Sequence, residues 1–233
     1  MNTSSRFLLC ISLVLGWSAG ALGGLVITDT DIVGGHYVYD LTFGEMDTVT
    51  VFEADVWQRV NCTVFKEPWQ VYARFVQPTR GQHTASFVYK FDFSGTDWRP
   101  VHMDLQEYVL LVRTEDLNED SRVVTAWSTD DVAYTTIQTC TSPVAPSQWA
   151  NYPATMSVAV PGMPESIYYK VTMNNFDSNG FSLVQTQWNR QVSTSPPPDG
   201  FRVDFTVEKP PVPEPAVLGL LGLAMLGARR RRA

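Results

Sequence analysis

Two cysteines are the residues of this chain best suited to covalent chemistry. The sequence has three, of which Cys10 lies in an apolar N-terminal segment, so that Cys62 and Cys140 remain in the body. In an oxidising compartment such a pair forms a disulfide more often than a reactive thiol or a metal site. Closing the loop of about 80 residues between them would stabilise the fold by about 4–5 kcal/mol in the chain-entropy description. We therefore expect a Cys62–Cys140 disulfide.

The histidines and carboxylates form no recognisable catalytic or metal-binding pattern. His36, His83 and His102 are far apart, and no two have the H-x-x-x-H spacing of a zinc site. The sequence also lacks G-x-S-x-G and a Walker-type glycine loop. Its 24 acidic residues leave a glycosidase pair open, but the sequence singles out no two of them. We expect no catalytic residue, no metal and no cofactor.

One acidic segment has part of a calcium-loop pattern. Asp116, Asn118 and Asp120 have the D-x-N-x-D spacing that supplies oxygen ligands. The sixth position is Ser121 in place of glycine, and the twelfth is Trp127 in place of glutamate. We therefore expect a solvated acidic turn with little or no calcium binding.

Four tryptophans fall in or beside segments that we expect to be loops. They are Trp57, Trp69, Trp98 and Trp149. Flat rings at such places could stack on sugar faces, although rings of this size more often fold back over an edge of the core. Trp98 and Trp149 are the candidates for a glycan-binding platform.

The segments that must position these residues have the pattern of β-strands. Apolar and polar residues alternate clearly around 87–93, 167–173 and 201–207. Further strands are expected near 36–43, 48–53, 70–76, 122–128, 132–138, 156–160 and 181–188. The run 108–112 has no polar face, so we expect a central strand covered on both sides. About ten short strands separated by turns in residues 24–207 predict an all-β domain, an antiparallel β-sandwich of jelly-roll type.

Part of this body resembles jelly-roll modules that often bind sugars. Residues 127–137 and 167–171 look like two adjacent strands of such modules. Their S-x-D-G-x-x-W hairpin begins here at Ser128, with Asp131 in place of Gly and Tyr134 in place of Trp. The resemblance implies architecture more than a ligand.

The charge of the chain is unevenly distributed. The formal net charge is −7, yet five of the 17 basic residues are Arg6 and the four arginines at the C-terminus. All 24 acidic residues lie between these two basic segments. Nucleic acid is therefore an unsuitable partner, because its binding depends on clustered Lys and Arg.

Residues 1–23 have the order of a secretory signal peptide. Arg6 is followed by an apolar stretch from Phe7 to Trp17 and then by small residues. Cleavage after Ala21 or after Gly23 fits the small-residue rule equally well. We expect the general secretion machinery to export the chain.

The C-terminal end has three parts in a fixed order. A Pro-rich spacer at 208–215 precedes an uncharged run of thirteen residues at 216–228, and four arginines follow: Arg229, Arg230, Arg231 and Arg232. We expect 216–233 to be a short transmembrane helix with a basic tail, which keeps the arginines cytoplasmic and the body outside. Thirteen residues span about 20 Å as a helix, against a hydrocarbon core of about 30 Å, which favours a transient span.

This arrangement resembles the PEP-CTERM sorting signal, with Val212, Pro213, Glu214 and Pro215 as its motif. In that family the tail is recognised by exosortase, a membrane-embedded cysteine peptidase of Gram-negative bacteria that make extracellular polysaccharide. The resemblance implies an exosortase partner, transient tethering in the inner membrane and delivery to the cell surface or extracellular matrix. It covers about the last 22 residues and implies nothing about the body.

For the body we expect a non-catalytic surface or extracellular-matrix protein. A polysaccharide-binding module or adhesin is the nearest alternative, and a glycan-active enzyme is a distant one. Ordered surface aromatics across one sheet would favour the binding module, whereas two carboxylates facing each other in a cleft would favour the enzyme.

Overall fold

The computed structural model describes eight stretches of the chain: 24–41, 50–51, 55–67, 70–75, 83–112, 122–141, 149–175 and 201–211. The signal peptide expected at 1–23, the PEP motif, the run 216–233, the acidic turn at 116–120 and the strand expected at 181–188 lie outside these described residues. The described chain is almost entirely strand, with one short 3-10 turn, η1 (Asp29–Asp31).

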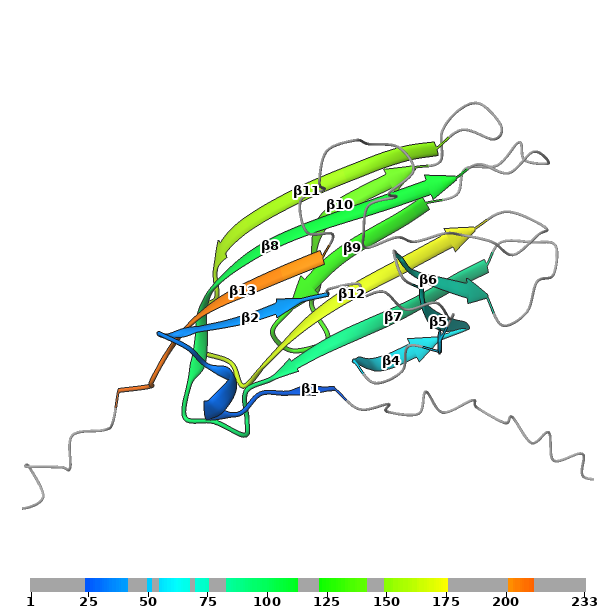
Figure 1. The fold of residues 1–233 in the computed structure, drawn as a ribbon. Helices are drawn as coiled ribbons and strands as arrows, with labels where there is room; N and C mark the ends of the chain where they lie inside the picture. The colour runs from blue at the N-terminus through cyan, green and yellow to red at the C-terminus, as the bar shows by residue number, and fades with distance from the viewer. Residues whose placement is uncertain are drawn as a thin grey trace, which may run out of the picture.

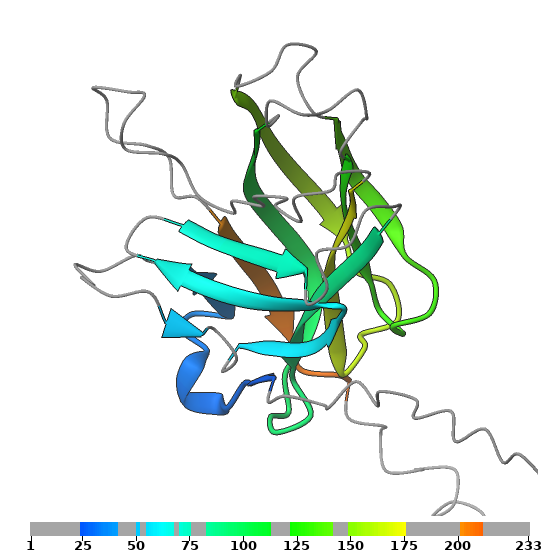
Figure 2. The ribbon, with the colours of Figure 1, turned by 90° about the vertical axis from the view of Figure 1, so that its right-hand side faces the viewer.

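The strands form two facing sheets and one small extra sheet (Figures 1 and 2). Sheet A has the order β1-β7-β12-β9-β10, with β4 also paired to β7. Its strands are β1 (Leu25–Val26), β4 (Val56–Val60), β7 (His83–Asp92), β9 (Arg122–Ser128), β10 (Thr135–Thr141) and β12 (Ser166–Asn175). Sheet B has the order β11-β8-β13-β2, made of β11 (Trp149–Ala159), β8 (Arg99–Val112), β13 (Phe201–Glu208) and β2 (His36–Asp40). Sheet C joins β3 (Thr50–Val51), β5 (Cys62–Glu67) and β6 (Gln70–Phe75).

The connections between the strands follow the jelly-roll pattern. From β7 to β13, successive strands alternate between sheets A and B, except for the hairpin of β9 and β10 within sheet A. The last strand, β13, enters sheet B between β8 and β2, and pairs antiparallel with both. The four neighbouring strands β7, β12, β9 and β10 of sheet A and the four strands of sheet B thus form the two interleaved layers of a jelly roll. The expected antiparallel β-sandwich is therefore confirmed.

Large side chains fill the space between sheets A and B. The alternation predicted from the sequence places Phe87, Tyr89, Phe91 and Phe93 of the β7 segment fully inside. Rings from the two sheets meet directly: the centroids of Tyr169 and Phe201 are 4.7 Å apart. Each such aromatic pair contributes about 0.5–1.5 kcal/mol beyond the burial of its area. This rigid core fixes which residues of each strand face outward.

Several strands have bounds that differ from those expected. β10 begins at Thr135, because the Asp130 carboxylate accepts hydrogen bonds from the backbone of Val132 and Ala133 and holds residues 129–134 as a turn. β11 begins at 149 and includes Pro153, which is tolerated because β11 is an edge strand of sheet B. Tyr108 is partly exposed, because it lies with Asp104 and Gln106 on the outward-facing side of β8. The prediction that 108–112 is covered on both sides is therefore wrong at Tyr108.

The two cysteines of the body do not form the expected disulfide. Cys62 and Cys140 are both buried free thiols. The Cys62 thiol donates to the carbonyl of Ser86 on β7, whereas Cys140 lies on β10, beyond β12 and β9. Cys62 lies on β5 and contacts β7, which is three strand spacings of about 4.8 Å from β10 in sheet A, whereas a disulfide requires α-carbons within roughly 6 Å of each other.

One carboxylate points into the core from β8. Glu107 is 1% exposed and accepts hydrogen bonds from Thr125 (2.5 Å), Gln138 (2.6 Å) and Tyr169 (2.5 Å). Burial raises the pKa of Glu107, and these three hydrogen bonds oppose that rise. The buried group thus joins sheet B to β9, β10 and β12 of sheet A.

Candidate functional site

The outer face of sheet B carries a regular array of polar side chains. On β8 the residues that face outward are His102, Asp104 and Gln106, which alternate with the inward-facing Met103 and Leu105. The strand register places Gln106 between Thr155 of β11 and Arg202 of β13. One row further along, Asp104 lies between Ser157 and Asp204. Residues far apart in the sequence therefore meet in two adjacent rows.

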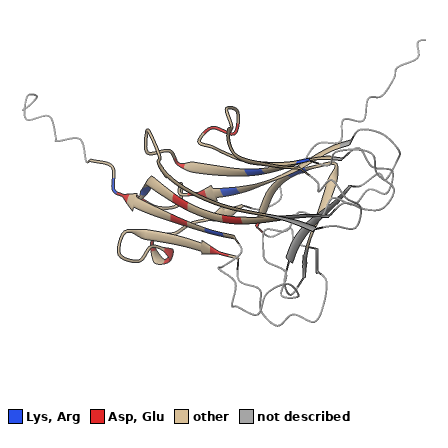
Figure 3. Cartoon of the chain, turned by 90° about the horizontal axis from the view of Figure 1, so that it is seen from above, with Lys and Arg blue, Asp and Glu red and all other residues tan. Residues whose placement is uncertain are grey.

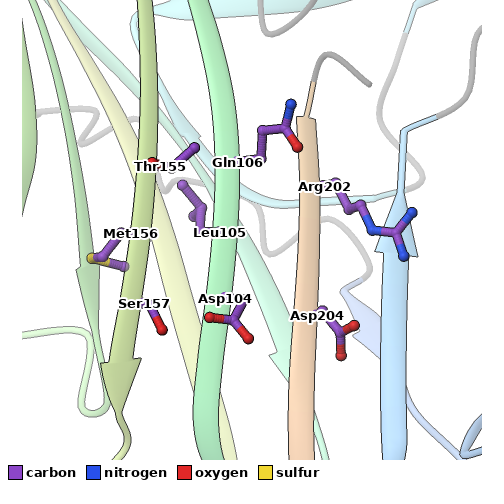
Figure 4. A pocket seen from close by; sticks show the side chains of 8 residues that line it. All are labelled: Asp104, Leu105, Gln106, Thr155, Met156, Ser157, Arg202 and Asp204. Carbon is purple, nitrogen blue, oxygen red and sulfur yellow. The ribbon is translucent and has the colours of Figure 1, made fainter. Parts of the chain in front are cut away.

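These two rows line a shallow pocket of about 500 Å³, here called the polar pocket (Figure 4). Its lining residues are Asp104, Leu105, Gln106, Thr155, Met156, Ser157, Arg202 and Asp204. Tyr108 follows Gln106 on the same face of β8 and stands opposite Pro153. The pocket thus combines hydroxyl, amide, guanidinium and carboxylate groups, with a partly exposed aromatic ring one row beyond it.

The charged groups of the polar pocket are held by neighbours. Nε2 of His102 lies 3.3 Å from Asp104 and 2.9 Å from the Ser157 hydroxyl. A hydrogen bond with Ser157, supported by His102, lowers the pKa of Asp104. Asp204 pairs with Nδ1 of His36 at 3.0 Å. Both carboxylates are therefore oriented by partners from β2, β8 or β11.

The groups of the polar pocket can act through hydrogen bonds. Asp104 and Asp204 stand directly opposite each other in the register of β8 and β13. A general acid needs a raised pKa, whereas that of Asp104 is lowered. Carboxylates that accept, and an arginine and an amide that donate, can bind the hydroxyl groups of a sugar.

The outer face of sheet A has a different character. We call Trp57, Tyr134, Tyr168, Lys90 and Lys170 the aromatic surface. The ring centroids of Trp57 and Tyr168 are 5.2 Å apart, although they come from β4 and β12 on either side of β7. Nζ of Lys90 lies 5.9 Å from the Trp57 ring, and Nζ of Lys170 lies 4.9 Å from the Tyr134 ring. All five side chains are partly exposed.

The turn before β10 holds Tyr134 in this surface. Asp131 has a φ of 60°, the left-handed conformation that favours glycine, which fits its place at the Gly position of the resembled hairpin. The Tyr134 hydroxyl donates to the Asp131 carboxylate. This turn therefore fixes the ring beside Lys170.

Of the four tryptophans that the sequence places in or beside loops, only Trp57 belongs to the aromatic surface. Trp98 packs against the core, with Nζ of Lys209 5.1 Å from its ring, so it behaves as a ring folded over the edge. The Trp149 side chain and all of Trp69 lie outside the described residues. Trp57 is on strand β4 and not in a loop. Tyr168 and the residues of the polar pocket were not singled out by the sequence, because their proximity depends on strand register.

Two of the three histidines, His36 and His102, pair with aspartates. His36 and His102 both lie on the outer face of sheet B, whereas the side chain of His83 is not described. Within the described stretches, no group of three or more His, Cys, Asp or Glu residues could hold a metal ion.

Acidic and basic residues are interspersed along the strands in Figure 3.

Over the part of the chain that the structure describes, no helix has the length and apolar character needed to cross a membrane. The run 216–233, expected to span, lies outside that part.

One family matches the sequence. Residues 211–232 match the PEP-CTERM protein-sorting motif, which confirms the resemblance of the C-terminal end. No curated protein matches the chain.

Several solved structures resemble the chain weakly. TmCBM61 in complex with β-1,4-galactotriose has 7% identity and a TM-score of 0.33, over 60% of this chain and 83% of its own. A CBM4 structure has 10% identity and a TM-score of 0.29, over 71% and 97%. The arabinose-bound α-L-arabinofuranosidase MgGH51 has 11% identity and a TM-score of 0.38; the match covers 79% of this chain but only 29% of that longer chain. At these identities and scores, the similarities identify no ligand.

Proposed function

We propose that this protein is a non-catalytic, polysaccharide-binding component of the cell surface or extracellular matrix, delivered there through its PEP-CTERM tail. The match at residues 211–232 supports sorting by an exosortase-type peptidase after export. The body then acts outside the cytoplasm, and its chemistry must be sought on its exposed faces.

The polar pocket is the observation that carries the binding function. Gln106 and Arg202 adjoin in one row, and Asp104 and Asp204 in the next, so donors and acceptors alternate over a short distance. A sugar offers hydroxyl groups that both donate and accept, and an apolar ring face that Tyr108 can stack against. Binding sites for small ligands commonly combine a few fixed polar groups with an aromatic wall.

The surroundings of the two aspartates support the non-catalytic part of the proposal. Both glycosidase mechanisms need one carboxylic acid that stays protonated to serve the leaving group. Hydrogen bonding lowers the pKa of Asp104, and a histidine pairs with Asp204. Neither environment is the apolar pocket that keeps a catalytic acid protonated.

Affinity electrophoresis of the exported protein tests the binding function. Gels would contain galactan, mixed-linkage β-glucan, xylan or dextran, and the control variant would be Thr139→Ala, at an exposed position of β10. At least one polysaccharide should retard the parent and the control. Gln106→Ala/Arg202→Ala should bind about tenfold more weakly, since two lost hydrogen bonds of about 1 kcal/mol each exceed the 1.4 kcal/mol of a tenfold change. Equal retardation of all three proteins would exclude the polar pocket.

The same samples test the absence of catalysis. No reducing sugar should appear on long incubation with any of the four polysaccharides. If the parent releases reducing ends and Asp204→Asn does not, the protein hydrolyses the polysaccharide, which would contradict the non-catalytic proposal.

The sorting step has its own test. Intact masses of the body, compared in cells with and without exosortase, should show loss of the tail only when exosortase is present. Replacement of Pro213, Glu214 and Pro215 by alanine should retain export but leave the precursor in the inner membrane. Persistence of all four terminal arginines on the mature protein of exosortase-containing cells would contradict exosortase processing.

A further inference from the structure

The aromatic surface lies on the opposite side of the sandwich from the polar pocket. The pocket opens on the outer face of sheet B, and the aromatic surface covers the outer face of sheet A, while the core rings pack between the two sheets. Packed sheets are about 10 Å apart, and each surface points away from the other. The same stretch of a sugar chain cannot contact both surfaces.

The rings of the aromatic surface are not part of the core. Inward-facing neighbours such as Tyr169 and Phe91 are essentially inaccessible, whereas Trp57 and Tyr168 remain partly exposed in contact with each other. Their contact spans the width of β7 and leaves apolar ring area open beside the ammonium groups of Lys90 and Lys170. Exposed aromatic rings beside hydrogen-bonding groups present both an apolar face and polar partners to a sugar ring.

The charges around these rings favour an uncharged partner. Lys90 forms an ion pair with Asp92 at 2.6 Å. Lys170 stands by Tyr134, whose turn carries Asp130 and Asp131. Two lysines and three aspartates thus lie on the aromatic surface or in the turn next to it, so neither a polyanion nor a polycation gains from a single-sign field. A neutral glycan loses nothing by this balance.

We infer that the aromatic surface is a second contact site for neutral glycan chains, so that one copy of the body cross-links two chains. This inference rests on the proposed binding function, in which the polar pocket holds the first chain. Trp57 and Tyr168 provide the stacking surface, and the partly exposed Lys90 and Lys170 beside them provide polar contacts. Bivalency of this kind converts weak single contacts into stable bridging between chains.

The test combines affinity electrophoresis with turbidity of a soluble polysaccharide. The exported protein is titrated into galactan, mixed-linkage β-glucan, xylan and dextran, with polygalacturonate as the anionic control. For a neutral polysaccharide that retards it, the parent should raise the turbidity at intermediate ratios and clear it at excess protein. Trp57→Ala/Tyr168→Ala should still be retarded, through the pocket, but should raise turbidity at least tenfold less.

The reciprocal variant separates the two sites. Gln106→Ala/Arg202→Ala should still be weakly retarded, through the aromatic surface, but should no longer raise the turbidity. The variant that combines all four substitutions should be neither retarded nor able to raise the turbidity. Tyr168→Ala alone serves as the milder variant if the double change affects folding, which near-ultraviolet circular dichroism checks. Thr139→Ala should behave as the parent in both assays.

Three outcomes would overturn the inference in distinguishable ways. Turbidity equal to that of the parent in Trp57→Ala/Tyr168→Ala removes the aromatic surface as a site and leaves the pocket intact. If Gln106→Ala/Arg202→Ala is no longer retarded at all, although its aromatic surface is unchanged, the polar pocket is a single binding site. Failure of the parent to bind any of the neutral polysaccharides refutes the proposed function itself.

Discussion

Asp104 and Glu107 lie three residues apart on β8 but face opposite sides of sheet B. Asp104 is exposed in the polar pocket, and hydrogen bonding with Ser157 lowers its pKa. Glu107 is buried between the sheets, and burial raises its pKa although three side chains donate to it. The same functional group is thus available to a ligand on one face and locked into the architecture on the other. Strand alternation alone decides between the two roles.

The largest expected effect concerns the loss of the buried carboxylate. Glu107→Ala leaves Thr125, Gln138 and Tyr169 without their shared acceptor in the core, so the free energy of unfolding should fall by about 3 kcal/mol or more. The matched change Asp104→Ala, on the exposed side of the same strand, should alter it by less than about 0.5 kcal/mol. Chemical denaturation of both variants measures the difference. Similar losses for the two would show that the faces do not differ as described.

A smaller effect should appear in the pH dependence of stability. A carboxyl whose pKa is raised by folding stabilises the protein below its unfolded pKa of about 4.5, and this contribution is lost as the pH rises through the folded value. The glutamine side chain of Glu107→Gln cannot ionise, so the stability of this variant should not show this decrease with rising pH. The lowered pKa of Asp104 acts in the opposite sense, losing stability as the pH falls.

Thermal melting of the parent and Glu107→Gln from pH 4 to pH 9 provides the measurement. The melting temperature of the parent should decrease relative to that of the variant as the pH rises. A constant difference across the range would mean that Glu107 has the same pKa in the folded and unfolded states.

The smallest expected effect is that of a reducing agent. Burial raises the pKa of the Cys62 thiol to about 11, and burial together with the nearby Glu107 charge raises that of Cys140 to about 12. Both thiols should therefore react only after unfolding, and reduction should leave the melting temperature unchanged within about 1 °C. A disulfide would instead contribute about 4–5 kcal/mol in the chain-entropy description. Mass spectrometry that finds a linked Cys62–Cys140 peptide would contradict the separation of β7 and β10.

The sequence contains the pattern of this fold but not its register. The alternation of Phe201, Val203, Phe205 and Val207 predicts a strand with one buried face, and β13 has that face buried. It cannot predict that β13 pairs with β8, about 100 residues earlier, and so brings Arg202 beside Gln106. The failed disulfide has the same origin, since an even number of cysteines carries no information on distance. Sites assembled across strands are therefore the part that sequence patterns miss.

The position of β13 as the last described strand determines the end of the sandwich from which the chain continues towards its sorting motif. Glu208 pairs with Arg99, and Lys209 lies by Trp98, so the chain leaves the sandwich at the end formed by the turns at 94–98 and 161–165. Residue 211 is the last residue described at this end and the first of the match to the sorting motif. The polar pocket and the aromatic surface lie on the outer faces of sheets B and A and not at this end. Under the proposed function, removal of the tail would therefore leave both surfaces unchanged.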